Sequence, residues 1–418
     1  MSRYWLRLDN AALIFPAIRK KGWSNAFRIS TTLTEDIDPA VLQQAVCDLM
    51  PRFPSMYVRL RSGVFWHYLE EIKDAPKVSP DYAYPLTHMA HSDLKNCCLR
   101  VLYHKNRIAA EFFHSLTDGA GGSVYLKSLA ARYIELKYGE AVCGNGILCA
   151  EDAPSALEQE DSFLKYSAKK AMSRSEKTAY RLKGTKDKSF LHLITGTVHT
   201  SSLLDTAHKY GCTVTVLLAA VMTESVLSLQ AERSPGSKKP AKITLPVDLR
   251  RLFDSKTLRN FALTVNTCIY GNQKLSFEEI CREITRQVKY DVTKERMAAR
   301  IAANVLPQRS LLLRIAPLFL KNLVMRFVYH MSGEKLGCLN ISNLGASPMP
   351  ENAGKHIQRL EFIVGVQKTY PNNCSVISCG DVTSINMIRN IKEADLEQKF
   401  FSRLVELGIP VTIEYNER

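Results

Sequence analysis

Hydrophobic residues along the chain recur with two spacings, the alternation typical of strands and the three-to-four-residue period typical of helices. The apolar run 107–113 predicts a strand, and 98–103 predicts its partner across a short turn. Residues 39–50 follow the helical period, as do residues 124–134, whose helix we expect to be closed by Gly139. The first part of the chain therefore mixes strands and helices.

The same mixture continues from residue 191. A strand over 191–198 precedes a helix over 202–210 and a long apolar helix over 216–229, which Thr213 or Thr215 is expected to cap. The remaining expected elements are strands over 260–270, 375–378 and 384–388, a helix over 396–407, and an edge strand over 411–414. These patterns predict an α/β protein.

A change in composition separates the two parts. Residues 165–188 are rich in Lys and Arg and hold two acidic residues, Glu176 and Asp187, as is typical of a solvated face or a linker. A chain of 418 residues favours two domains. We expect an N-terminal lobe over 1–164, a basic crossover linker over 165–190 and a C-terminal lobe over 191–418.

The most apolar long segment, residues 311–331, is interrupted by Arg314, Lys321 and Arg326. It is therefore not expected to span a membrane, which takes about 18 or more uncharged apolar residues. We expect a helix packed against the core. The alternative is a basic helix that lies on a membrane surface.

Composition narrows the possible partners. With 46% hydrophobic and 23% charged residues, the chain has the make-up of a globular protein, and its formal net charge is +15. Such a charge attracts polyanions, among them the phosphates of coenzyme A (CoA). No nucleic-acid-binding motif is present, and neither a dinucleotide fingerprint nor a P-loop is found, so we expect no nucleic-acid partner.

Cysteine usage indicates the compartment. Eleven cysteines, an odd number, favour a reducing environment, and the N-terminus lacks the layout of a signal peptide. We therefore expect a cytoplasmic protein. The close pairs Cys97–Cys98 and Cys143–Cys149 do not have zinc-site spacing, and no metal is expected.

The candidate chemistry lies at 114–119, where His114 and Asp118 stand four residues apart at the end of the predicted strand and Gly119 follows. Backbone structure on both sides would fix such a histidine, as a general base requires. The alternative is a surface histidine beside an aspartate that caps a helix. The strand before it and the glycines after it favour a catalytic site.

His-x-x-x-Asp-Gly resembles the signature of the CoA-dependent acyltransferase superfamily, which includes chloramphenicol acetyltransferase, condensation domains and alcohol acetyltransferases. Other segments agree in order and separation, and the resemblance is strongest to bacterial alcohol acetyltransferase-like proteins. The matching segments are 8–12, 23–30, 52–54, 63–66, 246–250, 259–261 and 340–345.

The resemblance implies two chloramphenicol-acetyltransferase-like α/β lobes with a tunnel between them, and roles for several residues. His114 would be the general base for direct attack on a thioester, without an acyl-enzyme. Asp118 and Gly119 would support the active-site loop, with Asp118 paired to Arg250, or failing that to Arg251.

Two further positions follow from the same resemblance. Ser342 and Asn343 match a Ser-Asn strand motif and would line the tunnel opposite His114, as candidates for substrate or oxyanion contact. Without the resemblance, they are a polar pair satisfied in the core. Phe113 replaces the first histidine of the fuller His-His motif, which argues against peptide condensation.

The expected activity is therefore transfer of an acyl group, acetyl in the simplest case, from CoA to a hydroxyl or amine of a small molecule. No cofactor is expected to stay bound, because acyl-CoA is a co-substrate. Two alternatives stay open: a stand-alone condensation-type enzyme that takes its acyl group from a carrier protein, and a non-catalytic relative that acts as a binding module.

Overall fold

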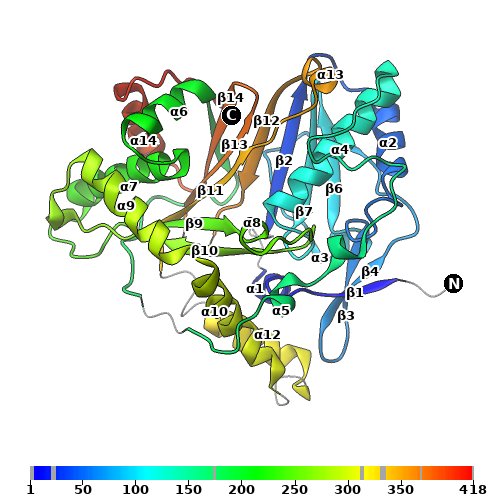
Figure 1. The fold of residues 1–418 in the computed structure, drawn as a ribbon, viewed down its shortest axis with the longest axis horizontal. Helices are drawn as coiled ribbons and strands as arrows, with labels where there is room; N and C mark the ends of the chain where they lie inside the picture. Colours follow the sequence, from blue (N-terminus) through cyan, green and yellow to red (C-terminus); the bar gives the residue numbers. More distant parts are fainter. Residues whose placement is uncertain are drawn as a thin grey trace.

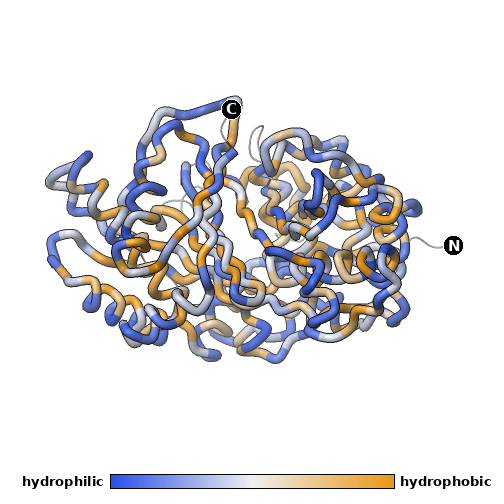
Figure 2. Tube along the Cα trace, turned by 90° about the horizontal axis from the view of Figure 1, so that it is seen from above, coloured by the Kyte–Doolittle hydropathy of each residue, from blue (hydrophilic) through white to orange (hydrophobic). Residues whose placement is uncertain are grey.

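Two large β-sheets, each covered by helices, organise the computed structural model, which describes residues 4–19, 25–172, 176–310, 315–329, 336–367 and 370–416. They form two α/β lobes that stand side by side (Figure 1). Seen from above, hydrophobic segments concentrate inside each half and hydrophilic ones follow the outer turns (Figure 2). The α/β class and the two lobes expected from the sequence are confirmed.

The N-terminal lobe is built on a five-stranded sheet in the order β12-β2-β7-β6-β5, with a small sheet, β1-β4-β3, beside it. The strands are β1 (Trp5–Arg7), β2 (Ala26–Leu33), β3 (Val58–Ser62), β4 (His67–Glu71), β5 (Ser79–Pro80), β6 (Leu99–His104), β7 (Arg107–Phe113) and β12 (Ile357–Val364). The helices are α1 (Ile14–Ile18), α2 (Pro39–Asp48), α3 (His91–Asn96), α4 (Gly119–Tyr138) and the 3₁₀ turn η1 (Ala156–Gln159).

The C-terminal lobe is built on a seven-stranded sheet in the order β10-β9-β11-β13-β14-β8-β15. Its strands are β8 (His192–His199), β9 (Ile243–Asp248), β10 (Ala262–Asn266), β11 (Leu339–Ala346), β13 (Asn372–Cys379), β14 (Val382–Arg389) and β15 (Thr412–Tyr415). The helices from residue 162 onward are α5 (Ser162–Lys165), α6 (Thr200–Lys209), α7 (Val214–Arg233), α8 (Arg250–Phe253), α9 (Phe277–Asp291), α10 (Lys294–Val305), α12 (Leu318–Val328), α13 (Glu351–Gly354) and α14 (Asp395–Glu406), with 3₁₀ turns η2 (Gly271–Gln273) and η3 (Leu306–Arg309).

Most predicted elements are confirmed, and the differences have local causes. Helix α4 begins at Gly119, five residues before the predicted start, because the Asp118 side chain accepts a hydrogen bond from Gly121 N and caps it. Thr213, and not Thr215, caps α7 through Val216 N. Strand β15 pairs only with β8 and so forms the expected edge.

One strand departs from the division into contiguous lobes. Strand β12, which we expected in the C-terminal lobe, pairs antiparallel with β2 and becomes the outer strand of the N-terminal sheet. Its residues Leu360 and Phe362 belong to the N-terminal core. The chain then returns to the other sheet in β13, where Ser375 Oγ donates to Phe362 O. The N-terminal lobe therefore includes a strand from the second half of the chain.

The helix expected in the core over 311–331 is not core-packed where it is described. Helix α12 turns large apolar side chains outward: Phe319 is 76% exposed, Leu323 63% and Phe327 64%. The prediction failed because α12 is held by hydrogen bonds from Lys321 to Phe65 O and from Arg326 to Ala17 O, and not by burial of its apolar stripe. Residues 311–314 and 330–331 of that segment, and Trp23 and Ser24 of another, lie outside the described residues.

Among the described residues, α7 alone is long and apolar enough to cross a membrane by length and composition, with 67% of its apolar window buried in the protein. Leu217, Leu218 and Val221 of this helix are fully buried in the C-terminal core. Its apolar character is thus accounted for by core packing.

Candidate active site

His114 is placed by strand β7 and by an aromatic contact on each side. Its backbone N–H donates to Asn25 O at 2.8 Å, which continues the pairing of β7 with β2 beyond Phe113. The imidazole stacks on Phe15 with ring centroids 4.4 Å apart, and the Phe27 ring meets it edge-on at 5.1 Å. Its orientation is therefore fixed by packing.

A hydrogen-bond chain determines which nitrogen of His114 carries the proton. Asn260 Nδ2 donates to Asp9 Oδ2 at 3.2 Å, so Asn260 Oδ1 is the atom that faces His114 Nδ1, at 3.1 Å. Because an amide oxygen only accepts, Nδ1 must carry the hydrogen. Nε2 then holds a lone pair, as a general base requires.

Asp9, which sets this polarity, is itself buried. Its Oδ1 accepts from Ala12 N at 2.8 Å, and Arg259 Nε lies 3.7 Å from Oδ2. Burial raises the pKa of Asp9, and the Arg259 charge opposes that rise. Either oxygen keeps a lone pair for Asn260 in both protonation states, so the chain holds its direction.

Burial also lowers the pKa of His114 below its ordinary value of about 6.5, and the charge of Asp118 opposes this only in part. The imidazole is therefore neutral near pH 7. A neutral, oriented imidazole can accept a proton from a hydroxyl or an amine held against Nε2.

Asp118 lies on the far side of the same turn and makes no hydrogen bond to His114. Its two carboxylate oxygens accept from Arg250 at 2.9 and 3.0 Å, from Phe261 N at 2.8 Å and from Gly121 N at 3.2 Å. The two contacts with Arg250 and the one with Phe261 hold α4 against the C-terminal lobe, and the contact with Gly121 caps α4 itself. Arg251, the alternative partner, points to solvent.

Every guanidinium nitrogen of Arg250 donates a hydrogen bond. Besides Asp118, its guanidinium donates to Asp248 Oδ1 at 2.8 Å, Thr257 O at 2.8 Å and Arg259 O at 2.6 Å. The charges of Asp118 and Asp248 outweigh burial and raise the pKa of Arg250, which stays a cation. Arg250 thus ties β9, the 257–259 loop and α4 together.

Glycines allow the two lobes to approach at this point. A Cβ on Gly121 would lie 2.1 Å from Leu258 O, and one on Gly119 would lie 2.8 Å from Leu344 Cδ2. Leu258 and Leu344 both belong to the second half of the chain. The glycines of the motif therefore serve close packing in the first turn of α4.

His114 opens on a cavity of about 310 Å³ between the lobes. Its walls come from α1, β2, β12, the end of β7 and the start of α4 in the N-terminal lobe, and from β9, β10 and β11 in the C-terminal lobe. The lining is mainly apolar. Polar side chains on it, besides His114, Asp118 and Arg250, are Asn25, Asp248, Asn260, Thr264, Tyr329, Asn340, Ser342, Asn343 and Gln367.

Ser342 and Asn343, predicted to line the tunnel, do line this cavity, but their side chains differ. Asn343 Nδ2 donates to Thr215 Oγ1 at 3.0 Å, and its Oδ1 accepts from Gly345 N at 2.8 Å, so its amide is engaged in shaping β11. Ser342 is half-buried at the cavity wall and is the better placed of the two for a bound molecule.

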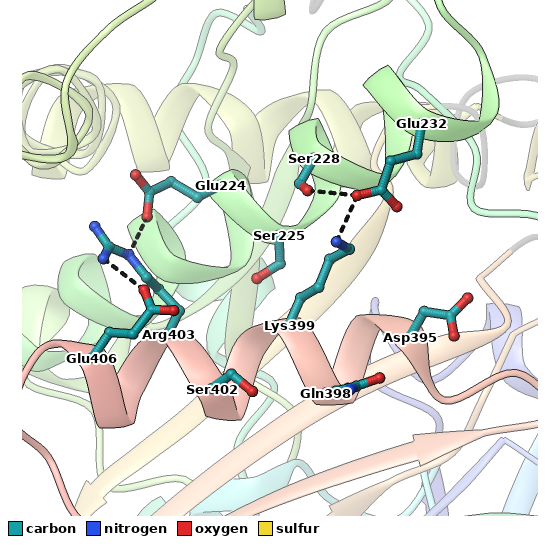
Figure 3. A pocket seen from close by; sticks show the side chains of 10 residues that line it. All are labelled: Glu224, Ser225, Ser228, Glu232, Asp395, Gln398, Lys399, Ser402, Arg403 and Glu406. Carbon is teal, nitrogen blue, oxygen red and sulfur yellow. Dashed lines mark hydrogen bonds and ion pairs between the residues drawn. The ribbon is translucent and has the colours of Figure 1, made fainter.

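Two other features carry no catalytic arrangement. Within the described ranges, no three His, Cys, Asp or Glu residues are grouped to hold a metal ion. A second hollow lies between α7 and α14 (Figure 3), where Glu224 pairs with Arg403 and Glu232 pairs with Lys399. Its charges satisfy one another, and none of the predicted site residues lines it.

Sequence reasoning gave no role to Asn260, Asp9 or Phe15. Asn260 and Asp9 fell in segments that matched the family resemblance, which was their only signal. Asn260 is 146 residues from His114 and 251 from Asp9, so no local spacing could show that they meet.

Comparison with solved structures identifies the fold. F. graminearum TRI101, solved with coenzyme A and T-2 mycotoxin, matches with TM-score 0.66 at 9% identity over 98% of this chain and 99% of that one. TRI3 trichothecene 15-O-acetyltransferase of Fusarium sporotrichioides matches with TM-score 0.60 at 13% identity over 97% and 94%. The epimerization domain of tyrocidine synthetase B matches with TM-score 0.60 at 12% identity over 97% and 96%.

Sequence comparison found no matching family model and no match among curated proteins. The solved structures nevertheless extend over nearly the whole chain. The fold implied by the sequence resemblance, that of CoA-dependent acyltransferases and condensation-type domains, is confirmed.

Proposed function

We propose that this protein, built on the fold of CoA-dependent acyltransferases and condensation-type domains, moves an acyl group from CoA to a hydroxyl or amine of a small molecule. The observation that carries the proposal is His114, a neutral imidazole whose Nδ1 is held by Asn260 and whose ring opens on the cavity between the lobes. Acyl transfer needs such a base, because the acceptor must lose its proton as it attacks.

In the proposed reaction, Nε2 of His114 takes the proton of the acceptor hydroxyl while the acceptor oxygen forms a bond to the thioester carbonyl carbon. The carbonyl oxygen then carries the negative charge of a tetrahedral intermediate. When this collapses, the carbon–sulfur bond breaks, and the imidazolium returns its proton to the departing CoA sulfur. No covalent bond to the enzyme is formed.

The intermediate's oxyanion needs a donor. The Ser342 hydroxyl is our candidate, because it lies on the cavity wall while the Asn343 amide is already engaged. Asp118 and Arg250 have a supporting role in this scheme, since they touch each other and the backbone and not the cavity-facing side of His114.

The structural neighbours support CoA as donor and an alcohol as acceptor, since TRI101 was solved with coenzyme A and T-2 mycotoxin and TRI3 is an O-acetyltransferase. A carrier-protein-bound donor is the second candidate, favoured by the likeness to an epimerization domain of a peptide synthetase. Phe113, in place of a first histidine, argues for the first candidate.

The decisive experiment offers acetyl-CoA and longer acyl-CoAs with a panel of alcohols and amines, and follows acylated products by mass spectrometry. His114→Ala should lower kcat at least about a hundredfold, with thermal unfolding and CoA affinity nearly unchanged. His104→Ala, an exposed histidine on the neighbouring strand β6, is the matched control and should keep wild-type turnover. Wild-type turnover in His114→Ala would refute the assignment.

A further inference from the structure

Helix α12 presents an unpartnered apolar face to solvent. Five large side chains form this face, Phe319, Leu320, Leu323, Val324 and Phe327, and Ile315 lies exposed just before the helix. Residues 319, 323 and 327 are four apart and therefore follow one stripe of the helix. A stripe of this kind in a globular protein normally faces the core, so its exposure calls for an external contact.

The turn between β3 and β4 extends the same surface. Leu318 N donates to Val64 O at 3.0 Å, and Lys321 Nζ donates to Phe65 O at 2.9 Å while lying 3.4 Å from the centre of the Trp66 ring. Val64 is 74% exposed and Phe65 45%. Helix α12 and this turn lie side by side at the lower edge of the molecule in Figure 1.

The chain segments that contain α12 and α1 are basic and lack acidic residues. Between Glu295 and Glu334 the sequence contains no Asp or Glu, but it carries Arg309, Arg314 and Arg326, besides Lys321, which is buried against the β3–β4 turn. Helix α1 packs on α12, and Arg326 donates to Ala17 O. The chain from Asn10 to Thr34 around α1 also lacks Asp and Glu, and Arg19, Lys20 and Lys21 directly follow α1. A basic surround with an apolar stripe is typical of helices that lie in the interface of an anionic membrane.

We propose that α12 and the β3–β4 turn dock on the surface of an anionic phospholipid bilayer, with the apolar face inserted among the lipids. A second copy of this chain is disfavoured by size: eleven helical residues are about 16 Å long, and a stable interface buries roughly 800 Å² on each partner. The exposed stripe of one such helix is well short of that, whereas it suffices for interfacial insertion.

The proposed membrane contact lies next to the candidate active site. Tyr329, which ends α12, and Phe15 and Ile18 of α1 all line the cavity that holds His114. The docked helix therefore adjoins the cavity of the candidate active site. If the proposed function holds, the acceptor or the acyl chain is an apolar molecule that enters from the lipid.

Vesicle co-sedimentation tests the contact without any acyl donor. The wild-type chain should sediment with phosphatidylglycerol vesicles at low salt, more weakly at high salt, and far less with phosphatidylcholine vesicles. The triple variant Phe319→Gln, Leu323→Gln, Phe327→Gln should bind at least about tenfold less, because it loses the inserted apolar area. The matched control Tyr82→Gln, Tyr415→Gln removes two rings that are 88% and 67% exposed elsewhere and should bind like wild type.

Each remaining outcome counts against the proposal. Equal sedimentation of wild type and triple variant, or no sedimentation of wild type with either vesicle, would overturn it. A wild-type dimer in light scattering that the triple variant converts to a monomer would assign the face to a second copy. Because sedimentation does not depend on turnover, a failed acylation assay would leave this result standing, and the reverse is also true.

Discussion

At the scale of single residues, the candidate site is a hydrogen-bond chain with a fixed direction. Asp9 orients the Asn260 amide, and the Asn260 amide oxygen keeps the hydrogen of His114 on Nδ1. Among the residues that the structure describes, no charged side chain hydrogen-bonds to the imidazole. The imidazole is therefore positioned by a neutral amide, and burial lowers its pKa.

Asn260 is predicted to be a positioning residue. Asn260→Ala removes the acceptor of the Nδ1 hydrogen, so the imidazole can shift to the unproductive tautomer, and kcat should fall at least about tenfold with little change in KM. Asn10→Ala is the control, since the Asn10 side chain bonds Asn304 O and not His114. Equal loss in kcat and in substrate affinity would instead indicate a general distortion of the cavity.

The pH profile should show the effect of burial on His114. The base is active when neutral, so kcat/KM should rise with pH through the pKa of His114, which burial places below about 6.5. More than half of the maximal kcat/KM should therefore be present at pH 6.5. A midpoint above that value, from initial rates across pH 5 to 8, would contradict a burial-lowered pKa.

Local order and a family resemblance were enough to predict His114 as a candidate and to pair Asp118 with Arg250, a contact that the structure contains. They did not identify Asn260 as the partner of His114, since the contact joins residues 146 apart through side chains only. The spacing of residues within a strand or helix predicts which of them share a face. It does not predict which distant loop packs against that face.

At the scale of elements, the start of α4 is the joint between the lobes. Asp118 caps the helix with one oxygen and takes the Arg250 guanidinium with both, and Gly121 lets Leu258 O approach. The side chains of Asp118 and Arg250 are 7% and 14% exposed. A pair so shielded from water is costly to break from one side.

A double-mutant cycle should reveal this pair. Asp118→Asn and Arg250→Ala should each lower the free energy of unfolding by roughly 3–5 kcal/mol, and the double variant should lose less than the sum. Denaturant unfolding measures all three. The surface pair Glu283 and Arg286 is the control and should show little coupling. Fully additive losses at Asp118 and Arg250 would show that the two do not act together.

Elements with a clear hydrophobic period were predicted well. The burial of an element was predicted poorly where it depends on which other elements pack against it. Strand β7 and helix α2 have patterns that fit one structure only. Helix α12 has the pattern of a core helix, yet its apolar stripe faces solvent. Amphipathic character shows that a helix has an apolar face, but the packing of α1 and the β3–β4 turn decides which way that face points.

At the scale of the whole molecule, net charge bears on substrate binding and the connectivity of the strands bears on folding. The net charge of +15 is large for 418 residues and gives the molecule as a whole a positive field. A substrate with several phosphate charges would be attracted by that field, whereas a neutral alcohol would not.

Donor binding should therefore depend on salt. In calorimetric titrations, the apparent affinity for acetyl-CoA should weaken between low and physiological salt, because ions screen phosphate–Lys and phosphate–Arg attraction. A neutral acceptor alcohol should change little between the same two conditions. Absence of binding by any acyl-CoA would favour a carrier-protein donor or a binding module.

The position of β12 has a consequence for how the chain is made. Every residue of β2 is buried, and its neighbours in the sheet are β7 and β12. During synthesis, β12 leaves the ribosome only after residue 364, when most of the 418 residues have been translated. Until then β2 has one open edge, the kind that attracts other strands. The N-terminal lobe is thus first in sequence but cannot be finished first, and a nascent chain stopped before β12 would need protection from aggregation.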